Sequence, residues 1–267
     1  MNNVFDFKRF GNYFLYDLRR TRNNYGISLL LMGLMPVAFF LVYQFISLIS
    51  GNGLTPMPNE LQIISLFVGV VVVMLGAGTK IYGNITEKRA GSDFLMLPAS
   101  TFEKWLSMVL VVCVVLPVVL FALLFASDGI MSLFFPNSYG TRIFEMDFMS
   151  GFFNGLAEDE GFYFNLPAAT FLNWCESLLI FTLGAVCFKK SKVAKTILCL
   201  IGFSMVLSPL MVLIFGNTNI DSDWLIEHFN DPDHAVSAIN WTLSILYTVV
   251  LGGLLAGLYF RLRTLKH

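Results

Sequence analysis

Charged residues are scarce in this sequence. Asp, Glu, Lys and Arg make up only 13% of its 267 residues, whereas 56% are hydrophobic and the mean hydropathy is +0.71. Because soluble domains carry about 25% charged residues, this composition excludes an ordinary soluble protein. It predicts an integral membrane protein, whose architecture is set by the need for about 20 apolar residues in each spanning helix.

Motifs for catalysis and nucleotide binding are lacking as well. A phosphate-binding loop ends in Gly-Lys-Ser/Thr after a glycine-rich turn, and the glycine-containing run at 76–80 has the wrong spacing and lies in an apolar stretch. No HExxH zinc motif occurs, and the four cysteines lie inside apolar runs without metal-ligand spacing. We therefore expect no enzyme activity in this chain, no metal site, no cofactor and no nucleic acid partner.

Six apolar runs are long enough to span a bilayer. They predict an all-α integral membrane protein with a single domain over residues 1–267. The predicted spans are 27–49, 62–82, 105–127, 168–188, 196–215 and 239–260, and the predicted long outer loops are 128–167 and 216–238.

The segment 4–20 before the first span is predicted to be an amphipathic helix in the cytoplasmic headgroup layer. At about 100° per residue it has an apolar face and a polar face. The apolar face holds Val4, Phe7, Phe10, Gly11, Phe14, Leu15 and Leu18, and the polar face holds Asp6, Arg9, Asn12, Asp17 and Arg20.

The basic residues indicate the orientation. Every Lys and Arg except Arg142 falls in the N-terminal segment, in the connections after the second and fourth spans, or in the C-terminal tail. The remaining connections are acidic. By the positive-inside rule both termini are cytoplasmic, and we expect a multi-pass protein of the plasma or inner membrane.

The connection at 84–104 combines charge with the apolar run at 94–97. A loop that faces water rarely exposes four such residues unless something covers them, so we interpret it as a docking surface for a cytosolic partner. The alternative, in which 95–97 lie against the headgroups, stays open. Ser100 and Glu103 fit a capping box, so the third spanning helix should start at Ser100. The residues assigned to docking are Glu87, Lys88, Arg89, Asp93, Phe94, Leu95, Met96, Pro98, Ser100, Glu103 and Lys104.

Four further residues lie inside predicted spans and are candidates for function. Glu176 is the one acid in such a segment, and an intramembrane carboxylate is a candidate pathway residue; the alternative is that it reaches the headgroup region. Pro36, Pro117 and Pro209 each remove a backbone hydrogen bond and should kink their helices. They are candidate hinges for gating, with packing curvature as the alternative.

The run Leu97-Pro98-Ala99-Ser100-Thr101-Phe102-Glu103-Lys104, the amphipathic segment and the six spans together resemble the membrane subunit of an ABC transporter, of the type-2 exporter permease family. The resemblance covers nearly the whole chain. It implies a separate cytosolic ATPase subunit that docks on 84–104. It also implies a second permease chain, identical or homologous, in the same lipid bilayer.

The long aromatic outer loop at 128–167 departs from the simplest members of that family, so no substrate is implied. The alternative function is a membrane anchor or sensor that does not transport and binds a ligand through its outer loops.

Overall fold

The computed structural model describes residues 5–51, 53–87, 91, 94, 96–140, 142–143, 166–215 and 232–264, and within these ranges the regular secondary structure is entirely helical. The elements in chain order are α1 (Phe7–Gly33), α2 (Met35–Ile49), α3 (Asn59–Tyr82), the 3-10 turn η1 (Gly83–Thr86), α5 (Thr101–Leu110), the π-helical segment η2 (Val111–Val115), α6 (Leu116–Phe134), α7 (Pro136–Tyr139), α9 (Leu166–Cys187), α10 (Lys192–Phe215) and α12 (Pro232–Arg263).

Most of these helices are apolar and long. Four stretches in the described part of the chain are long and apolar enough to cross a membrane, and the bent pair α1–α2 brings the number to five. The four are Asn59–Thr86, Thr101–Phe134, Lys192–Pro209 and Ser244–Arg263. The described part of α9, Phe171–Cys187, is a shorter apolar helix. The predicted all-helical fold is therefore confirmed for the described residues, and the length and apolar composition of these helices suggest a membrane protein.

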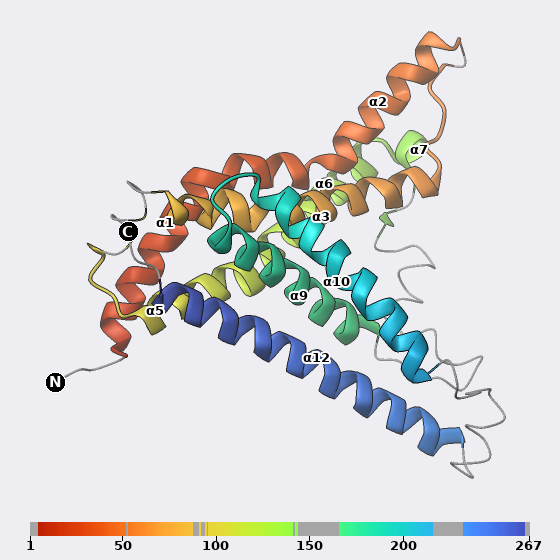
Figure 1. Cartoon of the computed structure of the whole chain (residues 1–267). Coiled ribbons are helices and arrows are strands. Elements are labelled where there is room, and N and C mark those ends of the chain that lie inside the picture. The colour runs from red at the N-terminus through yellow and green to blue at the C-terminus, as the bar shows by residue number, and fades with distance from the viewer. Residues whose placement is uncertain are drawn as a thin grey trace.

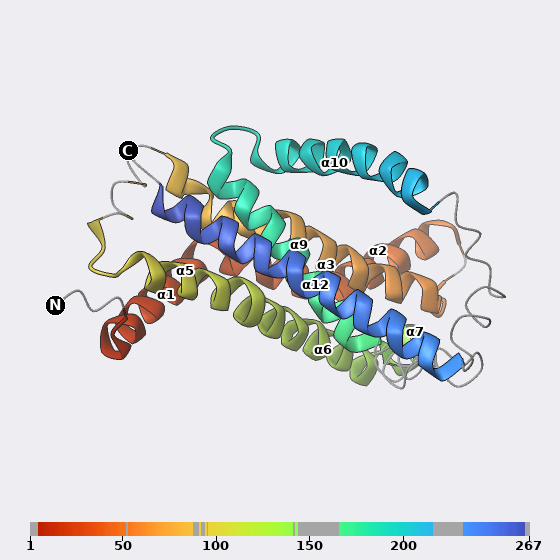
Figure 2. The same cartoon turned by 60° about the horizontal axis from the view of Figure 1, so that its bottom comes forward.

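Helix α9 is the packing centre of the bundle. It contacts α3, α10 and α12, and α10 and α12 lie on different sides of it (Figures 1 and 2). Two glycines allow the close approach: a Cβ at Gly78 of α3 would lie 2.6 Å from the Thr182 hydroxyl, and one at Gly184 of α9 would collide with the Thr196 side chain of α10. Small residues of this kind let helix backbones approach closely in membrane proteins.

Helix α1 runs alongside α5 and α6 in the same direction. Arg9 contacts Glu103, Asp17 contacts Ser107, and the Gly33 carbonyl accepts a hydrogen bond from Ser127. No break separates the expected amphipathic segment from the following apolar part, because α1 is continuous from Phe7 to Gly33.

The assignment of the two faces of α1 was wrong at Asp17. Its side chain was expected on the polar, water-facing side, but Asp17 is only 1% exposed. The periodicity separates two faces but does not say which one meets the rest of the protein. Hydroxyl groups on neighbouring helices decide this, because they bond the Asp17 carboxyl.

The kink predicted at Pro36 is confirmed. Helix α1 ends at Gly33, Pro36 lies in the first turn of α2, and the two helices meet at a bend of 46°. Pro117 is the second residue of α6, and the π-helical segment η2 ends at Val115, two residues before this proline. Pro209 lies inside α10. Irregularities of this kind are common sites of bending in helices.

The start of the second outer loop was predicted too early. Helix α6 continues beyond Asp128 to Phe134 and is followed by α7. Asp128 is buried and accepts hydrogen bonds from the Tyr139 hydroxyl (2.8 Å) and the Ile143 N–H (3.0 Å). These donors allow the Asp128 carboxylate to lie inside the protein, although the sequence predicted that Asp128 would lie in a loop. The rest of that loop, 144–165, and residues 216–231 of the third loop lie outside the described residues.

Candidate functional site

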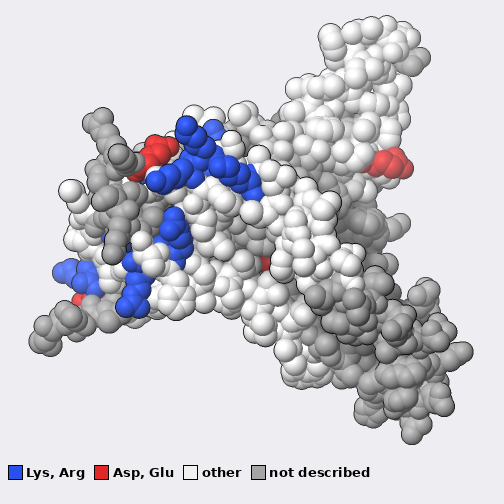
Figure 3. Space-filling view, in the orientation of Figure 1, with Lys and Arg blue, Asp and Glu red and all other residues white. Residues whose placement is uncertain are grey.

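One end of the bundle carries most of the described basic residues. The first turn of α1, the last turn of α3, the first turn of α5 and the last turn of α12 all meet there (Figure 1), and Lys and Arg side chains gather on that end (Figure 3). The first turn of α3, with Glu60, lies at the opposite end. The described ends of the segment 84–104 also lie at this basic end.

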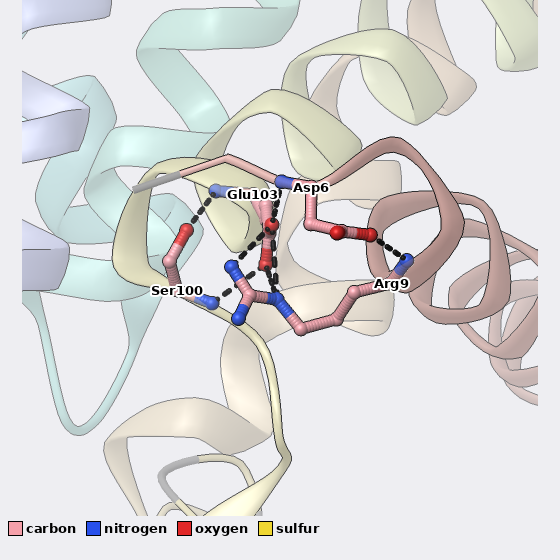
Figure 4. A network of polar contacts seen from close by, with 4 residues as sticks. All are labelled: Asp6, Arg9, Ser100 and Glu103. Atoms are coloured by element: carbon pink, nitrogen blue, oxygen red, sulfur yellow. Dashed lines mark hydrogen bonds and ion pairs between the residues drawn. The ribbon is translucent and has the colours of Figure 1, made fainter. Parts of the chain in front are cut away.

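A capping box starts α5, as the sequence predicts. The Ser100 hydroxyl accepts a hydrogen bond from the Glu103 N–H (3.1 Å), and the Ser100 N–H donates to a Glu103 carboxylate oxygen (2.8 Å) (Figure 4). The box satisfies two backbone N–H groups that the helix itself leaves free. It fixes where the loop ends and the helix begins.

The Glu103 carboxylate also binds the start of α1. The Arg9 guanidinium donates to both of its oxygens at 2.7–3.0 Å, and the Asp6 N–H donates at 2.9 Å (Figure 4). Asp6 in turn caps α1 by accepting from the Arg9 N–H. These contacts join residues 94 positions apart, and we call Asp6, Arg9, Ser100 and Glu103 the capping clamp.

The clamp holds Glu103 in its charged form. The helix Thr101–Phe134 has 34 residues, about 50 Å at 1.5 Å per residue, and is longer than a hydrocarbon core of about 30 Å. Glu103 precedes the predicted span 105–127. Burial alone would raise the pKa of the Glu103 carboxyl. The bonds from Arg9 and from the Ser100 and Asp6 N–H groups outweigh it and lower the pKa to about 2.

Three of the residues assigned to docking face the inside of the chain. Phe94 is 3% exposed and belongs to the main apolar core, and Glu103 and Lys104 are also buried. The Lys104 ammonium lies 4.9 Å from the centre of the Phe94 ring and donates to the Phe94 carbonyl at 2.7 Å. The assignment of these three to a partner surface was therefore wrong. Phe94 lies against the first turn of α5, a contact that the sequence did not predict.

Other parts of the loop do reach the surface. Met96 is 81% exposed, Pro98 and Glu87 are exposed, and Leu97 packs partly against the core. Lys88, Arg89, Asp93 and Leu95 lie outside the described residues. Met96, Pro98 and Glu87 therefore remain candidates for a docking surface, whereas the buried Phe94 does not.

The other end of the loop is fastened to α10. The Lys192 ammonium donates to the Gly83 carbonyl at the end of α3. Lys192, Arg9 and Asp6 were not among the predicted site residues. Asp6 carried a local signal, since Asp is a preferred N-cap residue. Lys192 and Arg9 carried none that distinguishes them from the other basic residues at this end.

The intramembrane candidates are not brought to this site. Glu176 lies in α9, partly buried, three residues after Asn173 and remote in sequence from the clamp. Pro36 and Pro117 mark the two helix irregularities described above. Their roles as pathway residue and hinges stay predictions.

Comparison with known proteins gives no match to this chain among protein-family models, curated proteins or solved structures.

Proposed function

We propose that this chain is the membrane-spanning subunit of an ABC-type export system and that a separate cytosolic ATPase subunit docks on loop 84–104. In this proposal six helices span the plasma or inner membrane with both termini cytoplasmic. A second permease chain, identical or homologous, completes the pathway. The resemblance in sequence, the long apolar helices and the gathering of Lys and Arg at one end support the proposal.

The observation that carries the proposal is an exposed apolar side chain on a loop that is fixed at both ends. Met96 is 81% exposed, while Phe94 before it is anchored in the core and Ser100 after it starts a capped helix. The bond from Lys192 to Gly83 fastens the far end of the loop. Methionine is common at adaptable binding surfaces, and a rigid support reduces the entropy lost when a partner docks.

The loop also continues into a long helix that can transmit movement. Helix α5 passes through η2 into α6, so the helical stretch that begins at Thr101 reaches Phe134 at the other end of the bundle. Trp105 of α5 donates a hydrogen bond to the Leu255 carbonyl of α12 at 3.0 Å. Movement of the loop would therefore carry α1, through the capping clamp, and α12, through Trp105. ATP can drive such movement only if the ATPase contacts the loop differently in its two states.

The test is co-purification with the ATPase encoded by a neighbouring open reading frame that contains GxxxxGK[ST]. Met96→Asp should lower ATPase recovery about tenfold or more, as expected when an interface anchor is lost. Leu54→Asp is the matched control, because Leu54 is 69% exposed in the α2–α3 connection at the opposite end, and it should leave recovery unchanged.

Equal ATPase recovery with both variants, at equal amounts of inserted protein, would place the docking surface elsewhere. Failure of the wild-type chain to recover any such ATPase would favour the anchor or sensor function.

A further inference from the structure

The buried face of α1 is polar over its first half. Tyr13, Asp17, Thr21 and Tyr25 follow one another at four-residue intervals, and all four are buried. Residues at this spacing lie on one face of a helix. This face meets α3 and α5, so polar groups lie where apolar packing is the norm.

Asp17 joins three helices at this face. One oxygen of its carboxyl, Oδ2, accepts hydrogen bonds from the Tyr82 hydroxyl of α3 at 2.9 Å and from the Ser107 hydroxyl of α5 at 2.7 Å. The other oxygen, Oδ1, receives no hydrogen bond from the described residues. The Thr21 hydroxyl, one turn further along α1, is also without a partner among them.

No described cation forms an ion pair with Asp17. The groups that act on it are Tyr13 and Arg20 of α1, Tyr82 of α3 and Ser107 of α5, and of these only Arg20 is charged. Arg20 acts through space and makes no hydrogen bond or ion pair with the carboxyl in the described part of the chain. An ionised carboxylate buried without a bonded cation is costly, whereas a neutral carboxyl with hydrogen bonds is tolerated.

The titration of Asp17 agrees with this geometry. Asp17 precedes the predicted span 27–49, and Arg19 and Arg20 follow it in the sequence. Burial raises the pKa of the Asp17 carboxyl. The bonds from Ser107 and Tyr82 and the charge of Arg20 offset only part of that rise.

We propose that Asp17 is a proton-binding site whose neutral carboxyl holds α1, α3 and α5 together, and whose deprotonation loosens this junction. The two hydroxyl donors bind Oδ2, and the proton occupies the carboxyl in place of a cation. This proposal goes beyond the proposed export function and does not depend on it, since it concerns the bundle of this chain alone.

Protonation of Asp17 in the folded state should make the stability of the bundle decrease as the pH rises. A carboxyl whose pKa is raised on folding binds more protons in the folded state than in the unfolded state. Its contribution to stability is fully present below the unfolded pKa and is lost as pH rises toward the raised folded pKa. Replacement by Asn keeps an oxygen that accepts from Tyr82 and Ser107, and removes the charge at every pH.

The experiment compares the thermal unfolding of the purified full chain in detergent at pH 5 and pH 8. Asp17→Asn should unfold at a temperature higher than the wild type by a few degrees at pH 8, and the difference should shrink at pH 5. Asp128→Asn is the matched control, because Asp128 is equally buried but both of its oxygens accept hydrogen bonds. It should lower the unfolding temperature at both pH values.

A second measurement detects the protonated carboxyl of Asp17 directly. Infrared spectra of the wild type should contain the carbonyl band of a protonated carboxyl that disappears on raising the pH and is absent from Asp17→Asn. An equal loss of stability in Asp17→Asn at both pH values, with no band missing, would overturn the proposal. Stabilisation of the wild type at pH 8 by sodium and not by choline would overturn it too, because a metal ion would then carry the charge.

Discussion

Truncating Phe94 and Met96 one at a time separates folding from docking. Phe94 is 3% exposed, its ring lies under the Lys104 ammonium, and it belongs to the main core. Removal of a buried Phe side chain costs about 3–5 kcal/mol. At about 2–4 °C per kcal/mol for a chain of 150–250 residues, Phe94→Ala should lower the unfolding temperature by about 6–20 °C.

Met96→Ala should behave in the opposite way. Met96 is exposed, and exposed substitutions usually change stability by less than about 0.5 kcal/mol, so its unfolding temperature should stay within about 2 °C of the wild type. Its effect should instead be on ATPase recovery. A second apolar cluster consists of Phe40, Met57, Met131 and Tyr139. Phe40→Ala is the control for a loss of stability without damage to the loop, because Phe40 is buried in this cluster.

The assay is thermal unfolding in detergent, followed by intrinsic tryptophan fluorescence and combined with co-purification of the ATPase. An unfolding temperature for Phe94→Ala within about 2 °C of the wild type would refute the inference that this side chain is a core residue. Phe94 would then be available for docking, as the sequence alone predicted.

Three further predictions concern topology, Glu176 and the capping clamp. In a background without native cysteines, Ser191→Cys should react with an impermeant thiol reagent only from the cytoplasm and Ser150→Cys only from outside; the reverse pattern would overturn the orientation. Glu176→Gln should insert normally and retain export, and a strong loss of export at normal protein level would make Glu176 a pathway residue. Glu103→Gln should lower the unfolding temperature by a similar amount at pH 5.5 and pH 8, because a carboxyl with a pKa lowered to about 2 contributes its stability above the ordinary value of 4.5 and loses it only as pH falls from there toward 2. A wild-type-minus-variant difference that grows between pH 5.5 and 8 would contradict this assignment.

Local patterns in the sequence were reliable where the interaction is local. The capping box at Ser100 involves residues three positions apart, and the break near Pro36 follows from the missing N–H of proline. The predicted second span, 62–82, coincides with most of α3 because a long apolar run has few alternatives. Such features need no knowledge of the rest of the fold.

Features that depend on distant partners could not be predicted. The amphipathic pattern placed Asp17 toward water, because nothing near it in sequence shows that Tyr82 and Ser107 will supply two hydroxyl donors. The Arg9–Glu103 contact likewise joins residues that share no local pattern. Phe94 was misplaced for the same reason, since its burial depends on where the loop folds.

The capping clamp also has a consequence for biosynthesis. Helix α1 is translated 94 residues before the carboxylate that binds it. At about 5–20 residues per second, Arg9 leaves the peptidyl-transferase centre about 5–19 s before Glu103 is added to the chain. During this interval the start of α1 has neither the Glu103 carboxylate nor the Ser107 hydroxyl, and of its polar contacts with later helices only the bond from Tyr82 of α3 to Asp17 can form. Once α5 has been made, the Arg9–Glu103 and Asp17–Ser107 contacts can form together. Insertion of the third apolar segment is therefore the step that completes the attachment of the N-terminal end of α1.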